Sequence, residues 1–238
     1  MIKTEKTGLA TGGLVEALYS HGVHFGFIKS RRHPSTKPYI YGVKNKIEIF
    51  DLEKTGKALE RALSFIEEVA SKNGKILFVS SKNEAKEAVS SMAESIGEPY
   101  VAGRFIGGTI TNFSQIRKRV EKMESLISQR EKGELSKYTK KERLLIDREI
   151  DKLKTFFSGL SVMKALPQAV FIVDSKKESI AVKEAQKANI PIIAICGTDN
   201  NLNEVEYPIP ANDASKSSIE FILKKVVESF KAGQLKKE

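Results

Sequence analysis

The sequence predicts an α/β domain whose parallel sheet is interrupted by a protruding two-helix arm. Short, continuously apolar segments alternate with amphipathic helical segments, a pattern typical of parallel strands covered on both faces. Two long, highly charged helical runs follow a pair of adjacent glycines and break this alternation. The alternation resumes at about residue 165. The arm is therefore expected as an insertion into one α/β body.

The first half of the body contains short elements in the order expected for such a fold. Residues 12–20 predict an amphipathic helix, and residues 46–50 alternate as a half-buried strand does. Asp51 is expected to cap a long helix, because apolar positions recur at helical spacing after it. A strand over 75–79 and a helix over 83–95 then precede the glycine pair.

The second half repeats this rhythm. The predicted elements are strands over 169–173, 190–196 and 207–209, and helices over 177–188 and 213–230. Residues 231–238 are expected to form a flexible tail, as chain ends often do.

The hinge between body and arm lies in residues 103–113. Gly107 and Gly108 leave the backbone free to adopt positive φ or to approach another surface closely. Asn112 with Gln115 fits a helix N-cap and its reciprocal partner. A helix is therefore expected to begin at residue 113.

The arm has the pattern of an antiparallel coiled coil. Apolar residues follow a four-three-four spacing in both helical runs, and a polar link around Gly133 would fold one run back on the other. The predicted seam consists of Ile116, Val120, Met123, Ile127, Ile146, Ile150, Leu153 and Phe157. Residues 113–158 contain 13 basic and 8 acidic residues, so ion pairing cannot absorb the positive charge. We expect the outer faces of the two helices to contact phosphates. The alternative is that these faces are solvated.

Composition narrows the class of partner. The 238 residues include 40 Lys and Arg against 30 Asp and Glu, a net charge of +10 that favours a polyanion. No apolar run approaches the roughly 20 residues that span a bilayer, and the first seven residues lack a signal-peptide core. Cys196 is the single cysteine. We therefore expect a cytosolic protein without disulfides or membrane partner.

A second basic segment precedes the arm. All three histidines lie in residues 21–34, where no cysteine or carboxylate stands at ligand spacing, so no metal is expected. Arg31 and Arg32 beside Pro34 predict an anion-contacting loop, although a solvated turn explains the loop equally well when it is taken alone.

An enzyme of the doubly wound class acting on a phosphorylated small molecule is the alternative. Such an enzyme needs a phosphate-binding glycine turn or a titratable cluster at its strand ends. The turns after Val79 and Val173 contain neither GxGxxG nor a Walker loop, and no GxSxG elbow occurs. We predict no catalytic residues and no cofactor.

Several motifs resemble one known family. They are His24-Phe25-Gly26, Arg31-Arg32-x-Pro34, Lys37-Pro38-Tyr39-Ile40, residues 49–55, residues 74–79, the 104–112 hinge, Leu166-Pro167 and residues 181–185. In order and spacing they are similar to the small-subunit ribosomal protein S-two family, bacterial type, over residues 12–223. The resemblance implies a flavodoxin-like three-layer domain with an inserted antiparallel coiled coil, and no catalytic role.

The same resemblance implies a structural protein that binds small-subunit rRNA. It implies a place on the solvent side near the head–body junction, as a monomer among other ribosomal proteins, and docking of the mRNA-capturing protein S-one. The expected rRNA contacts are His24, Lys29, Arg31, Arg32, Lys37, Arg104, Thr109, Asn112, Arg117, Lys118 and Arg119.

The chain departs from the family pattern in four places. Phe27 stands where the family commonly has histidine, His33 and Phe105 replace tryptophans, and Gly197 replaces an aspartate.

The domain prediction is 1–111 for the first part of the body with its rRNA-contacting segment, 112–158 for the arm, 159–230 for the second part and 231–238 for the tail.

Overall fold

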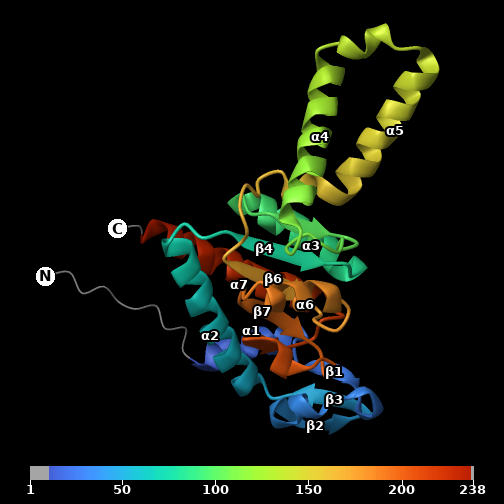
Figure 1. The fold of residues 1–238 in the computed structure, drawn as a ribbon. Coiled ribbons are helices and arrows are strands. Elements are labelled where there is room, and N and C mark those ends of the chain that lie inside the picture. The colour runs from blue at the N-terminus through green and yellow to red at the C-terminus, as the bar shows by residue number, and fades with distance from the viewer. Residues whose placement is uncertain (1–10, 237–238) are drawn as a thin grey trace, which may run out of the picture.

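A computed structural model describes residues 11–236 (Figure 1). The predictions for the first seven residues and for the last two residues of the tail fall outside this range. Within it, no helix is long and apolar enough to cross a membrane. The body is built on a five-stranded parallel sheet, as the apolar segments predict.

The strands are β4 (Ile76–Ser80), β5 (Tyr100–Ala102), β6 (Ala169–Val173), β7 (Ile192–Cys196) and β8 (Tyr207–Pro210). Their order in the sheet is β5-β4-β6-β7-β8, which is the doubly wound order of flavodoxin-like proteins. The chain reverses direction across the sheet between β4 and β6. Ligands of doubly wound proteins bind at this switch point.

Two apolar cores flank the sheet because successive side chains of a strand point to opposite faces. One face buries residues such as Phe78 and Phe171 beneath α1 (Thr11–Ser20), α2 (Leu52–Ser71), α3 (Asn83–Ile96) and α7 (Lys216–Leu235). The other face buries Leu77 and Val170 beneath α6 (Ser179–Lys187) and the base of the arm. The body therefore has three layers.

Two helix ends test the sequence predictions directly. Asp51 caps α2 through hydrogen bonds from the N–H groups of Glu53 and Lys54, as predicted. The predicted start of a flexible tail at residue 231 is wrong, because α7 continues to Leu235. Its last turns pack on α2, and a side chain at Gly233 would lie 2.5 Å from the Glu67 carbonyl oxygen.

A small antiparallel sheet precedes α2 and extends the predicted strand at 46–50. It contains β1 (Phe25–Ile28), β2 (Ile40–Lys44) and β3 (Ile47–Phe50) in the order β1-β3-β2. Asn45 and Lys46 join β2 to β3, and both have positive φ, as a two-residue hairpin requires. Glu48 and Phe50 point inward in β3, while Ile47 is exposed.

The arm consists of α4 (Phe113–Glu131) and α5 (Lys140–Phe157), joined by a short turn over Glu134–Lys137. Six of the eight predicted seam residues are buried, and Ile127 and Ile146 are partly buried. The two helices diverge with distance from the body (Figure 1). The seam is therefore packed most closely at the base, and a continuous coiled coil stays a prediction.

The arm and the small sheet lie at opposite edges of the large sheet (Figure 1). The turn after α5 packs on β5, where a side chain at Gly159 would lie 2.3 Å from the Tyr100 carbonyl oxygen. Strand β1 is bonded instead to the loop after β7, because the Phe27 N–H donates to the Thr198 hydroxyl at 2.9 Å. The body therefore separates the two basic regions.

Candidate nucleic-acid interface

The basic loop, residues 29–37, is fixed firmly to the body. The His33 N–H donates to the Thr198 carbonyl oxygen at 2.9 Å, and the Thr36 hydroxyl donates to the same oxygen at 3.0 Å. The His33 ring caps the following turn by accepting from the Ser35 N–H. The loop is therefore a rigid platform for its charged side chains, which lowers the entropic cost of binding.

Three cations of the basic loop are available to a partner. Lys29, Arg31 and Lys37 are exposed. The Arg31 guanidinium lies 5.1 Å from the centre of the Phe27 ring, an arrangement that orients the cation without neutralising it. The exposure of these three residues is compatible with the rRNA contacts that we predict for them.

Arg32 has a different environment. Its Nη1 lies 3.0 Å from Oε1 of Glu48, whose side chain is completely buried in the small sheet. The other Glu48 oxygen, Oε2, has no hydrogen-bond partner among the described residues. Arg32 therefore compensates a buried charge, and we remove it from the expected rRNA contacts.

The two neighbouring arginines are expected to respond differently to mutation. Arg31→Glu should leave the free energy of unfolding within about 0.5 kcal/mol of the native value and should lower the salt slope of rRNA binding by about 0.9 or more. Arg32→Ala should cost roughly 2–3 kcal/mol of folding stability, because it leaves the Glu48 carboxylate buried without its cation. Urea denaturation and filter binding separate the two effects. Equal loss of stability in both variants would contradict this division.

His24 is not available as an RNA contact either. Its side chain is buried, and its ring stacks on Tyr19 with the ring centres 4.6 Å apart. Burial and the nearby Lys44 charge lower the pKa of the His24 imidazole, which favours the neutral ring. We assign it a packing role.

The hinge is held by one carboxylate from the body. Glu184 of α6 accepts hydrogen bonds from the N–H groups of Gly108, Ile110 and Thr111. Gly108 has a φ of 93°, which the glycine pair makes possible. These donors would suit a phosphate, but they are already used within the chain. The clamp fixes the hinge to α6 instead.

The predicted contacts within the hinge divide into exposed and buried residues. Arg104 and Asn112 are exposed. Thr109 is buried, and its hydroxyl donates to the Ile106 carbonyl oxygen at 2.6 Å, so it has no free group for RNA. Asn112 is the N-cap residue of α4, as predicted, but its side chain makes no capping hydrogen bond. The predicted reciprocal cap with Gln115 is therefore wrong.

The predicted contacts on the arm divide into one cation that is bonded within the chain and two that are exposed. Arg117 is used internally, because its Nε lies 3.2 Å from Glu121 and its Nη1 donates to the Ser161 carbonyl oxygen at 3.3 Å. Lys118 and Arg119 are exposed and form no ion pair within residues 11–236. Lys118 and Arg119 are thus the better candidates for phosphate contact.

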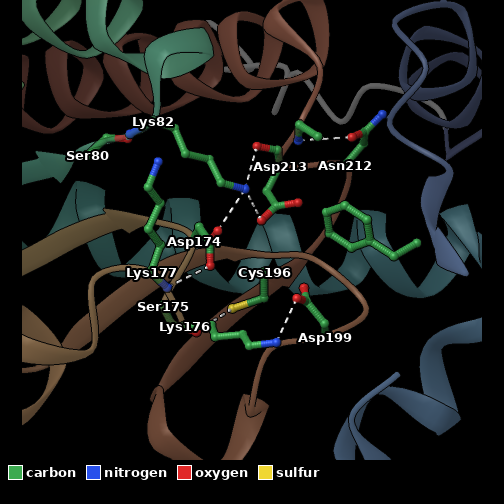
Figure 2. Close-up of polar contacts among 12 residues, drawn as sticks. Ser80, Lys82, Asp174, Ser175, Lys176, Lys177, Cys196, Asp199, Asn212 and Asp213 are labelled. Carbon is green, nitrogen blue, oxygen red and sulfur yellow. Dashed lines mark hydrogen bonds and ion pairs between the residues drawn. The ribbon is translucent and has the colours of Figure 1, made fainter. Parts of the chain in front are cut away.

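The structure also contains a buried ionic cluster that the sequence reasoning missed. Lys82, Asp174 and Asp213 follow β4, β6 and β8 respectively. The Lys82 ammonium lies 2.8 Å from the Asp174 carboxylate and 2.6 Å from the Asp213 carboxylate (Figure 2). It also donates to the Asp213 carbonyl oxygen at 3.0 Å. The turns after Val79 and Val173 do not reveal this cluster in the sequence, because residues that are distant in sequence converge there.

The cluster fills the place where a doubly wound enzyme would hold its substrate. Lys82 and Asp174 stand at the β4–β6 switch point, and both are largely buried. Burial opposes the charge of Lys82, but the carboxylates of Asp213 and Asp174 outweigh it and raise the pKa of the ammonium. Burial raises the pKa of the neighbouring Cys196 thiol to about 12, so it is not a nucleophile. The cluster is built to join strand ends.

Stability is expected to depend on pH through this cluster. Burial raises the pKa of Asp213 to about 6, against the opposing effect of the Lys82 charge. The folded state therefore binds this proton more tightly than the unfolded state, and the stability that it contributes is lost as the pH rises from about 4 to about 6. Asp213→Asn should flatten the dependence in urea titrations, while Asp151→Asn on the exposed side of α5 should not. An unchanged slope in the Asp213 variant would contradict the assignment.

The sequence matches one family of known proteins over most of its length. A family model described as "Ribosomal protein S2" matches residues 18–233. A protein of Roseiflexus sp. (strain RS-1), named small ribosomal subunit protein uS2, is 42% identical over 94% of this chain and 86% of its own length. Proteins of the same name from Coprothermobacter proteolyticus and Thermus thermophilus are each 42% identical, over 92% and 90% of this chain and 82% and 84% of their own lengths. The chain belongs to the ribosomal protein S2 family.

Membership makes the chain a structural protein of the ribosome rather than an enzyme, in agreement with the filled switch point. Two of its departures from the family pattern lie side by side. A side chain at Gly197 would meet Phe27 Cε2 at 3.0 Å and Asp213 Oδ1 at 2.6 Å. The Phe27 ring and the Asp213 carboxylate therefore leave no room for an aspartate at 197.

Proposed function

We propose that the protein is a structural constituent of the small ribosomal subunit and binds its rRNA with exposed cations on both sides of the body. The observation that carries the proposal is the family match together with this charge placement. The proposed contacts are Lys29, Arg31 and Lys37 of the basic loop, Arg104 and Asn112 of the hinge, and Lys118 and Arg119 of the arm. Such contacts position a protein on RNA, while RNA shape supplies the specificity.

The finer proposal concerns the neighbours of the protein. It places the chain as a monomer in the cytoplasmic ribosome, on the solvent side near the junction of head and body. In this proposal, α4 and α5 pack against each other as a coiled coil along the predicted seam. The proposal also includes docking of the mRNA-capturing protein S-one. The relatives' name supports the subunit, and the family resemblance supports the position.

Sedimentation of a tagged chain through a density gradient tests the proposal. We expect the protein to migrate with small subunits at low salt and at moderate salt, because several phosphate contacts act together. A triple Glu variant at Lys29, Arg31 and Lys37 should shift the protein toward the light fractions. A native chain found only in ribosome-free fractions would overturn the proposal.

A further inference from the structure

A groove on α2 lies outside the basic loop, the hinge and the arm. It measures about 410 Å³ and opens between α2 and the turn that precedes β2. Its lining consists of Pro38, Tyr39, Lys54, Lys57, Ala58 and Arg61. The groove thus joins an apolar wall to a row of cations.

The sequence of α2 explains this shape. Lys54, Lys57 and Arg61 are three and four residues apart, so they lie on one side of the helix. Ala58 stands between them, and its small side chain leaves the floor open. The Lys54 ammonium donates to the Pro38 carbonyl oxygen at 2.6 Å, which ties the apolar wall to the helix.

Two of the three cations of the groove are not neutralised within the described chain. Lys57 and Arg61 are exposed, and neither forms an ion pair or a side-chain hydrogen bond with residues 11–236. Lys54 lies 3.4 Å from the Asp51 carboxylate. Glu53 and Glu60 occupy neighbouring positions of α2, but no carboxylate of the described residues lines the groove itself. A polyanion is the complementary partner.

We propose that this groove binds a single-stranded RNA segment, with a base against Tyr39 and the flanking phosphates at Lys57 and Arg61. Unpaired bases stack on aromatic side chains, and cations beside the ring hold the backbone. A bare anion or an acidic peptide would use the cations but would gain little from the aromatic wall. The proposal rests on the proposed RNA-binding function and adds a separate surface with its own binding mode.

The position of the groove makes it independent of the arm. The groove lies where α2 begins, beside the small sheet, whereas the arm leaves the opposite edge of the large sheet (Figure 1). Tyr39 borders the core on the face that the arm covers, but at this distant end of it. One short RNA segment cannot follow both surfaces. The groove would therefore hold a different part of the RNA from that held by Lys118 and Arg119.

The first experiment measures binding of the purified full chain to fluorescent oligouridylate at several salt concentrations. Lys57→Glu/Arg61→Glu should weaken binding about tenfold or more and lower the salt slope by about 1.4, for two phosphate contacts on a single strand. The matched control is Lys224→Glu/Lys231→Glu, which reverses two exposed lysines on α7. Equal losses in the two double variants would overturn the proposal.

The second experiment tests the aromatic wall. Tyr39→Leu keeps an apolar side chain at this half-buried position but removes the ring, and Tyr39→Phe keeps the ring. The Leu variant should bind oligouridylate about fivefold or more weakly, because stacking on a base is lost, and should bind inorganic polyphosphate as the native chain does. The Phe variant should retain both affinities, and thermal melting checks that both variants fold. Unchanged oligouridylate binding in the Leu variant would overturn the proposal.

These outcomes separate the groove from the general function. A native chain that sediments with small subunits but binds oligouridylate without α2 would refute the groove alone. A native chain that never sediments with small subunits would refute the ribosomal proposal, whatever α2 binds. Displacement of oligouridylate by polyglutamate at equal charge concentration would point to an acidic protein partner and would also overturn the RNA assignment.

Discussion

Lys82→Met is expected to lower the free energy of unfolding by about 3–5 kcal/mol. The substitution keeps the length of the side chain but removes the ammonium that lies between Asp174 and Asp213. The two carboxylates would then remain close together in a buried place without a counter-charge, which is the costly outcome of breaking a buried ion pair. Urea denaturation at pH 8 measures the loss.

Two further variants define this effect. Lys176 forms an ion pair with Asp199 at the same edge of the sheet, at 2.9 Å, but its side chain is 58% exposed. Lys176→Met should therefore cost less than about 1 kcal/mol. The triple variant Lys82→Met/Asp174→Asn/Asp213→Asn should recover part of the lost stability, because no buried charge remains. A Lys82 variant as stable as the Lys176 variant would show that the cluster does not hold the strand ends together.

Charge reversal at Lys118 and Arg119 is expected to have the largest effect on RNA binding among the double variants. Both side chains are exposed near the base of α4 and have no internal ion pair within the described chain. Lys118→Glu/Arg119→Glu should lower the slope of log affinity against log salt by about 1.8. This value corresponds to two lost phosphate contacts, at the slope of about 0.9 per contact that duplex B-DNA shows. Filter binding with small-subunit rRNA between low and moderate salt measures the slope.

Arg117 supplies the control for that prediction. It lies on the same helix turn, but Glu121 and the Ser161 carbonyl oxygen already occupy its guanidinium. Arg117→Gln should change the slope far less than the double variant does, and glutamine is preferred to glutamate here because a carboxylate would be repelled by the Ser161 carbonyl oxygen. An unchanged slope in the Lys118 and Arg119 variant would place this face of the arm in solvent or on protein.

Local patterns predicted most of the body correctly. Continuous apolar runs identify β4, β6 and β7 because parallel strands are buried on both faces, and Asp51 is a recognisable helix cap. The β2–β3 hairpin was harder to find, since its turn is Asn45-Lys46 and lacks the glycine of a typical hairpin signal. The helix over residues 231–235 was not predicted, because chain ends are often disordered. Here packing on α2 keeps the last turns of α7 helical.

Candidate contacts were less predictable than the fold. Residue type and charge cannot distinguish Arg31, which has no ion pair within the described chain, from Arg32, whose partner Glu48 lies 16 residues away on β3. The same limit concealed the contacts of Lys82 with Asp174 and Asp213, because the sheet brings the ends of three strands together. Burial of Thr109 depends likewise on the path of the hinge across α6. Each of these outcomes depends on tertiary packing.

The insertion of the arm between β5 and β6 has a consequence for how the chain folds. Ile76 of β4 pairs with Ala169 of β6, and these residues are 93 positions apart. Helical hairpins form from local contacts and on a faster timescale than long-range strand pairing. An arm that forms early brings Asn112 near Ser158 and removes about half of that span from the closing loop, which lowers its entropic cost by about 0.6 kcal/mol. The arm thereby shortens the search by which the central strands meet.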